Sequence, residues 1–228
     1  MRGVAPHRSR WAMLLLAGIL LAVPHARADV LTYPLTTCQI SKGCGSSTSF
    51  GTVTVSSLNS NEVSVTLTLA PNEVFAFGGA GQPLLFNVAN DPSISISNLT
   101  SNLTNTFAFN NAPMTMADGT GKWDYFISCS SCGTGTSLST TGPGGASVSV
   151  SFDVTLTGIT PESFTQSTKG FTFASDIGIP NGSGGFMTGD VGATTPVPLP
   201  PAVVLLGSAL LAALVFMRRR GPTAVAGL

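Results

Sequence analysis

The chain has 228 residues, enough for one sizeable domain or two small ones, and only 9% of them are charged. All ten acidic residues lie between Asp29 and Asp190, a region that holds three lysines, no arginine and no histidine. Without arginine, an acidic region lacks the phosphate contacts of nucleic-acid-binding proteins. Without histidine, it has neither an imidazole base nor an imidazole metal ligand.

Residues 1–28 are predicted to be a secretory signal peptide. Arginines precede an apolar run, residues 11–23, that is too short to span a bilayer, and Pro24 ends this run. Ala26 and Ala28 then place small residues before a cleavage site, so we expect the mature chain to begin at Asp29. A retained membrane anchor is the alternative interpretation.

Residues 29–181 are predicted to form an all-β ectodomain, an antiparallel β-sandwich. Residues 62–69 and 146–156 alternate strictly between apolar and polar side chains, as strands with one buried face do. Clusters of Gly, Asn, Asp and Pro favour turns between the shorter candidate strands, which are 50–55, 84–88, 94–99, 122–128 and 170–173. The following residues, 182–196, are rich in Gly and Thr and are predicted to be a linker.

Four cysteines, Cys38, Cys44, Cys129 and Cys132, allow three disulfide pairings. An exported chain meets oxidising surroundings, and the short spacings favour two local bridges, Cys38–Cys44 and Cys129–Cys132. The spacing of Cys129 and Cys132 also occurs in redox motifs, although no helix pattern follows that would favour a reactive thiolate. A thiol redox site and a four-cysteine zinc site are the open alternatives, whereas we predict no metal and no cofactor.

Other polar and aromatic residues offer weaker candidate sites. Asp118, Asp124 and Asp153 could act as acid–base groups or calcium ligands, but their spacing matches no calcium loop and solvated carboxylates are expected. Trp123 and Tyr125 alternate with charged residues and could stack on a sugar, or could be core aromatics of a strand. The N-glycosylation pattern, a weak signal in so polar a chain, occurs at 98–100, 102–104 and 181–183.

A tripartite tail follows the predicted linker. Val197, Pro198, Leu199 and Pro200 precede an apolar run, 202–217, which Arg218, Arg219 and Arg220 follow. As a helix, residues 199–217 would measure about 28 Å, close to the roughly 30 Å of a hydrocarbon core. The arginines place this end, with a short tail at 221–228, on the cytoplasmic side. The helix alone would also fit a plain single-span anchor.

The order of proline motif, short helix and arginine cluster resembles the PEP-CTERM sorting domain of Gram-negative bacteria, and more closely its VPLPA variant. The matching residues are Val197, Pro198, Leu199 and Pro200 for the motif, 202–217 for the helix, and Arg218, Arg219 and Arg220 for the basic stop. The sorting tail therefore covers 197–220. It departs from the pattern in reading VPLPPA and in continuing past the arginines. The resemblance implies recognition and cutting by an exosortase-type membrane enzyme.

The middle region is similar to an ectodomain type of the same family, in which a Gly-Lys-Trp-Asp-Tyr strand, here 121–125, runs into two paired cysteines and then a β-rich stretch, here 148–164. In this family such proteins are associated with exopolysaccharide and biofilm. We therefore expect a non-enzymatic protein that passes through the inner membrane to the cell surface or matrix and has extracellular polysaccharide as a partner. A carbohydrate-binding or adhesive module is the alternative, and an exported two-carboxylate hydrolase is the third hypothesis.

Overall fold

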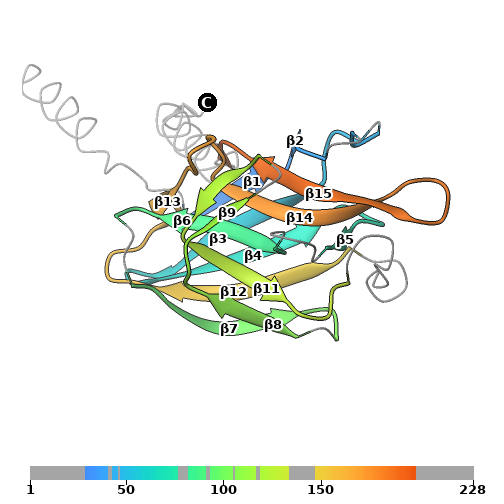
Figure 1. Cartoon of the computed structure of the whole chain (residues 1–228). Coiled ribbons are helices and arrows are strands. Elements are labelled where there is room, and N and C mark those ends of the chain that lie inside the picture. Colours follow the sequence, from blue (N-terminus) through green and yellow to red (C-terminus); the bar gives the residue numbers. More distant parts are fainter. Residues whose placement is uncertain are drawn as a thin grey trace, which may run out of the picture.

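The computed structural model describes residues 29–40, 43–45, 47–76, 82–90, 93–104, 106–116, 119–133 and 147–198. Over these residues the fold is all-β, with antiparallel strands in two large sheets packed face to face (Figure 1). The predicted signal peptide and the apolar segment of the tail lie outside the described residues. Within the described part of the chain, no helix has the length and hydrophobicity needed to span a membrane.

The first sheet has six strands in the order β16-β1-β3-β4-β12-β7. They are β1 (Val30–Pro34), β3 (Gly51–Asn59), β4 (Glu62–Leu69), β7 (Ser95–Ser101), β12 (Ser149–Thr155) and β16 (Val197–Pro198). Along β4 and β12 every second residue is buried, because one face of the sheet packs on the core and the other faces solvent. The solvent-facing positions of these strands are mostly Ser and Thr.

The second sheet has the order β2-β15-β14-β6-β11-β8, with β13 added to β6 and β5 to β14. Its strands are β2 (Thr37–Cys38), β5 (Val74–Phe75), β6 (Leu84–Val88), β8 (Phe107–Asn110), β11 (Tyr125–Cys129), β13 (Phe164–Thr165), β14 (Phe173–Pro180) and β15 (Phe186–Ala193). A short 3-10 turn, η3 (Pro161–Ser163), precedes β13, and β9 (Met114–Met116) pairs with β10 (Gly121–Trp123). Strand β6 is buried throughout, so both faces of this sheet are covered there.

The hydrophobic core lies between the two sheets. The Tyr33 ring of the first sheet meets the Phe173 ring of the second edge to face, with centroids 4.8 Å apart. Phe86 and Phe152 stack across the same interface at 5.7 Å. A smaller cluster, containing Trp123, lies on the other side of the second sheet. Aromatic contacts of this kind bury large apolar areas and fix the relative position of the sheets.

The alternating segments fold as predicted. Residues 62–69 are β4 and residues 84–88 are β6, while 50–55, 94–99 and 146–156 overlap β3, β7 and β12. The predicted strand at 122–128 is divided at Asp124 between β10 and β11. The predicted strand at 170–173 is wrong except for its last residue, because β14 begins at Phe173 and continues to Pro180.

The prediction of a linker at 182–196 is wrong over most of its length. Residues Phe186–Ala193 form β15, which pairs along its whole length with β14 and is buried in its second half. Glycines in β15 are suited to close packing rather than to flexibility, since a Cβ on Gly192 would overlap the Phe171 ring and one on Gly189 would crowd Ile40. The folded domain therefore extends past residue 181, as far as Pro198.

Candidate functional sites

The first and last strands of the domain lie side by side at one edge of the first sheet. In β1 and β16, Thr32 is paired with Val197 and Leu31 with Pro198, in antiparallel register. Strand β1 starts one residue after Asp29, the predicted mature N-terminus, and β16 is the first half of the predicted sorting motif. Leu199, Pro200 and the arginine cluster lie outside the described residues. The structure thus brings the predicted start of the mature chain and the start of the predicted motif together.

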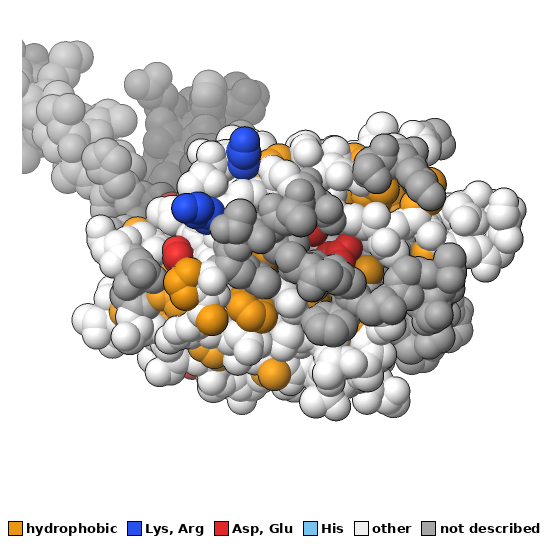
Figure 2. All heavy atoms as spheres, viewed as in Figure 1, with side chains coloured by type: hydrophobic (Ala, Val, Ile, Leu, Met, Phe, Trp, Pro, Cys, Tyr) orange, Lys and Arg blue, Asp and Glu red, His pale blue; other side chains and the backbone are white. Residues whose placement is uncertain are grey.

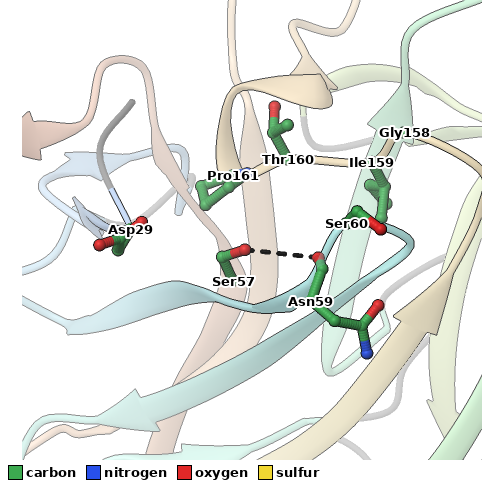
Figure 3. Close-up of a pocket in the computed structure, with 8 residues that line it drawn as sticks. All are labelled: Asp29, Ser57, Asn59, Ser60, Gly158, Ile159, Thr160 and Pro161. Atoms are coloured by element: carbon green, nitrogen blue, oxygen red, sulfur yellow. Dashed lines mark hydrogen bonds between the residues drawn. The ribbon is translucent and has the colours of Figure 1, made fainter. Parts of the chain in front are cut away.

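A shallow depression of about 310 Å³ lies at the end of the sandwich beyond this edge (Figure 3). It is lined by Asp29, Ser57, Asn59 and Ser60 on one side and by residues 158–161 on the other. The backbone amide of Ser57 donates a hydrogen bond to the Asp29 carbonyl at 2.8 Å, and the Ser57 hydroxyl donates to the Asn59 carbonyl at 3.5 Å. Its lining has a single carboxyl group, small polar side chains and the apolar Ile159 and Pro161, so it offers hydrogen bonds but no acid–base pair.

Both predicted disulfide bridges are formed. Cys38 at the end of β2 is bonded to Cys44, with Cα atoms 6.2 Å apart, and Cys129 at the end of β11 is bonded to Cys132, at 5.5 Å. Among the described residues no cysteine is free. Each bridge closes a short loop and packs against the core, so its role is to pin a turn.

The aromatic pair considered as a sugar platform is buried. Trp123 has no exposed surface and packs with Leu85 and Phe171, while its indole N–H donates to the Thr120 hydroxyl at 3.4 Å. Tyr125 is also buried and stacks on Phe86. Neither ring is accessible to a sugar, so the stacking interpretation of these residues is wrong.

The structure does not bring the candidate carboxylates together. Asp153 lies on the solvent face of β12 in the first sheet, where it accepts a hydrogen bond from the Asn98 amide at 2.7 Å. Asp124 lies between β10 and β11, and its backbone N–H donates to the Asn87 side chain at 2.8 Å. Asp118 lies outside the described residues. Within the described part of the chain, no cluster of three or more His, Cys, Asp or Glu residues is arranged to hold a metal ion.

Sequence reasoning did not identify a buried polar network on the outer side of the second sheet. Asp176 of β14 is paired directly with Asp190 of β15, and the two residues are 3% and 0% exposed. The Thr120 hydroxyl donates to Asp190 Oδ2 at 2.7 Å, and the Ser167 hydroxyl donates to the Thr120 carbonyl at 2.6 Å. These bonds anchor the segment that carries Trp123 onto the sheet. No sequence signal pointed to them, because Asp190 lies in the predicted linker.

Glu73 is a second buried acidic residue that the sequence did not single out. It lies just before β5 and is 4% exposed. Its Oε2 atom has no hydrogen-bond partner within the described residues. Burial raises the pKa of the Glu73 carboxyl to about 7, because the charged form loses its hydration.

The solvent face of the first sheet presents hydroxyl groups in rows across the strands. Strand pairing aligns one side chain from each of five strands in a single row: Thr32, Thr54, Thr66, Ser151 and Thr100. Neighbouring strands lie about 4.8 Å apart, and the Thr66 and Ser151 hydroxyls are within hydrogen-bond distance, at 2.8 Å. Charged side chains are also sparse on the face of the molecule seen in Figure 2. The described surface is thus rich in neutral hydrogen-bonding groups.

The three glycosylation patterns differ in how their asparagines are used. Asn102 donates to the Ser147 carbonyl at 2.8 Å and accepts from the Ser149 amide at 2.9 Å, so it joins the end of β7 to β12. The Asn98 amide is bonded to Asp153, as described above. Asn181 accepts hydrogen bonds from two backbone amides of its own turn, at Ser183 and Gly185. All three side chains therefore have structural roles.

Comparison of the chain with protein-family models, with curated proteins and with solved structures found no match.

Proposed function

We propose that this chain is an exported, non-enzymatic protein of the bacterial cell surface or extracellular matrix, whose β-rich ectodomain is delivered by cutting of a C-terminal sorting signal. The observation that carries the proposal is the extent of the folded domain. Its first strand begins at Val30, directly after the predicted signal-peptide cleavage, and its last strand ends at Pro198, inside the VPLP motif. The domain thus matches the part of the chain that would remain after removal of the signal peptide and cutting at the sorting motif.

Two further features support export. The pairs Cys38–Cys44 and Cys129–Cys132 are bridged, and disulfides persist in the oxidising compartments outside the cytoplasm. The prolines of the motif also suit a segment that a membrane enzyme reads as extended chain. Proline fixes φ and biases the residue before it toward extended geometry, and Val197 and Pro198 are extended in β16.

The test follows the full chain, tagged at its C-terminus, by immunoblot in a host that contains a sorting enzyme. The wild type is expected to lose the tag from the ectodomain, whereas Pro198→Ala with Pro200→Ala is expected to enter the membrane and remain full-length. A plain anchor would tolerate both alanines, because it needs only apolar length and flanking charge. If wild type and double variant both stay full-length and membrane-bound, the sorting proposal is wrong.

The hydroxyl rows favour a second candidate function, direct contact with extracellular polysaccharide. A face of neutral hydroxyls can exchange hydrogen bonds with sugar hydroxyls without desolvating charged groups. The rows take the place of Trp123 as the candidate contact, since that side chain is buried.

Thr54 and Thr66 lie in the middle of the longest row and are paired directly with each other. Replacing both by valine removes two hydroxyls while keeping the side-chain shape. The double variant is expected to lose co-sedimentation with the exopolysaccharide of the host, whereas Thr165→Val, at the exposed position of β13 in the other sheet, should keep it. Equal co-sedimentation of wild type and both variants would exclude this face as the contact.

A further inference from the structure

We infer that the end of the sandwich formed by Asp29, the β3–β4 hairpin and residues 156–161, here called the hairpin end, lies against the lipid surface before the tail is cut. The inference rests on the proposed function, because it requires the apolar tail to be in the bilayer. The sorting proposal does not say which face of the domain contacts the membrane. The inference names that face and its partner, a layer of neutral phospholipid headgroups.

The chain leaves the last strand in the direction of the hairpin end. Strand β16 runs antiparallel to β1, so the chain passes Thr32 and then Leu31 and heads toward the Asp29 end of the sheet. The apolar stretch 199–217 follows Pro198 immediately, and its uninterrupted apolar run begins at Ala202. Four residues of extended chain, as far as Ala202, cover at most about 14 Å. No longer spacer separates the folded domain from the expected membrane entry.

The β3–β4 hairpin continues in the same direction. Pro198, Leu31 and Val55 lie at one level across the sheet, and β3 runs on past Val55 to Asn59. Leu58 therefore lies about 10 Å beyond that level, at about 3.3 Å per residue. The hairpin reaches roughly as far as the short connecting chain does, so it comes into contact with the headgroup layer.

The side chains at this end suit such contact. Leu58 and Val197 are 52% and 55% exposed, and they are the two large hydrophobic side chains exposed within the described residues. Leu58 lies in the hairpin end, and Val197 lies in the last strand, one residue before the last described residue, Pro198. Ser60 and Asn61 at the hairpin tip are exposed and can hydrogen-bond to lipid headgroups.

The hairpin is held in place rather than free to bend away. The backbone amide of Leu156 donates to the Asn61 carbonyl at 3.0 Å, and the amide of Gly158 donates to the Asn61 side chain at 3.1 Å. At its base, Ser57 is bonded to Asp29. These bonds fix the hairpin to the loop that forms the rest of the hairpin end.

The charges of the region indicate the kind of lipid. Asp29 and Glu162 are exposed and Glu62 is partly exposed, and all three are acidic. The ammonium group of the expected mature N-terminus offsets the Asp29 carboxylate, and anionic headgroups would repel the other two at short range. A zwitterionic surface such as phosphatidylcholine or phosphatidylethanolamine would not, so it is the partner that the hairpin end fits.

The test uses the mature full chain reconstituted in phosphatidylcholine vesicles in which some lipids carry a nitroxide quencher on the headgroup. Leu58→Trp places a fluorophore in the hairpin end, and Ser60→Trp is a second variant at the tip. Ser183→Trp is the matched control, because the β14–β15 hairpin projects from the opposite end of the sandwich (Figure 1). The emission of buried Trp123, measured in the wild type, is subtracted.

The quencher is expected to remove most of the added emission of Leu58→Trp and Ser60→Trp and to leave that of Ser183→Trp nearly unchanged. Equal quenching at both ends, or stronger quenching of Ser183→Trp, would overturn the inference while leaving the sorting proposal intact. Vesicle flotation is recorded in the same samples. Chains that do not float with the vesicles would refute membrane insertion itself, and with it both proposals.

Discussion

Thr32 of β1 lies directly opposite Val197 of β16. Val197 is the first residue of the proposed sorting motif, so the motif begins inside the first sheet, next to the first strand of the domain. Only two residues of β16 are in the sheet, and Pro198 lacks an N–H with which to extend it. A short, proline-containing strand also protects the edge of β1 from pairing with other chains. The same two residues therefore complete the sheet and begin the segment that the sorting enzyme would read.

This pairing predicts that cysteines at both positions form a bridge. Directly opposed residues in antiparallel strands have Cα atoms about 4.5–5.5 Å apart, within the range of disulfides. Thr32→Cys with Val197→Cys should cross-link without reductant, as mapped by mass spectrometry of unreduced peptides. Thr32→Cys with Thr195→Cys should not, because Thr195 has no partner position in β1. A bridge in the control but not in the first variant would show that the register is different.

The bridge should also slow cutting of the tail. An enzyme that binds Val197 and Pro198 as single extended chain must first separate β16 from β1, and a covalent link prevents this separation. In a host with the sorting enzyme, the bridged chain is expected to stay full-length, and reductant should restore cutting. Val197→Cys alone controls for loss of motif recognition. Cutting of the bridged chain at the wild-type rate would show that separation is not required.

Glu73 predicts a pH-dependent stability. Its pKa is about 7 in the folded chain against 4.5 for an ordinary glutamate, so between these values the folded state binds more protons than the unfolded state. The free energy of unfolding therefore falls as pH rises through this window, by about 3 kcal/mol, and levels off above it. Chemical denaturation at about pH 5 and about pH 8 measures the difference.

The variant Glu73→Gln should abolish that fall, because glutamine stays neutral. Its free energy of unfolding at the higher pH should exceed that of the wild type. Glu162→Gln is the matched control, since Glu162 is exposed, and it should keep the wild-type pH dependence. A wild-type chain equally stable at both pH values would contradict the assignment to Glu73.

The sequence predicted those strands whose two faces have different environments. Residues 62–69 alternate because β4 has a buried and a solvent-facing side. Strands β14 and β15 were missed because Asp176, Asp190 and their neighbours are buried on both sides of the sheet, which removes the alternation. Trp123 was placed ambiguously for a related reason. The chain leaves β10 at Trp123 and enters β11 at Tyr125. Trp123 packs in the small cluster outside the second sheet, whereas Tyr125 packs in the main core between the sheets.

Of the candidate sites, those that depend on local sequence could be predicted, and those that depend on long-range pairing could not. Cysteine pairing could be predicted, because a bridge over three to six residues depends mainly on local geometry. The Asp176–Asp190 pair and the β1–β16 pair could not, because each joins segments that are distant in sequence and carry no pattern of their own. The position of a motif at a sheet edge is a property of the topology.

Asn102 predicts a structural effect distinct from glycosylation. Its side chain makes two hydrogen bonds to the backbone at residues 147 and 149. Asn102→Ala should lower the free energy of unfolding by about 1 kcal/mol for each bond lost. Thr104→Ala destroys the same glycosylation pattern without touching these bonds, so it should leave stability unchanged. If thermal denaturation shows equal losses for both variants, the effect does not come from the Asn102 amide.

The last prediction concerns the packing of β15, the strand that composition had marked as a linker. Gly192 lies beneath the Phe171 ring, and a Cβ at this position would overlap ring carbons. The ring belongs to the buried cluster with Trp123 and Leu85, so it cannot move aside without disturbing that cluster. Gly192→Ala should therefore lower the free energy of unfolding by about 1–3 kcal/mol, the usual range for overpacking. Gly185→Ala is the matched control: its Cβ would lie 3.2 Å from Nδ2 of exposed Asn181, so a small shift of that side chain, which keeps its bonds to the amides of Ser183 and Gly185, relieves the contact. Denaturant titration of the three chains measures the difference. Equal stability of all three would mean that β15 is packed loosely, and that its glycines serve flexibility after all.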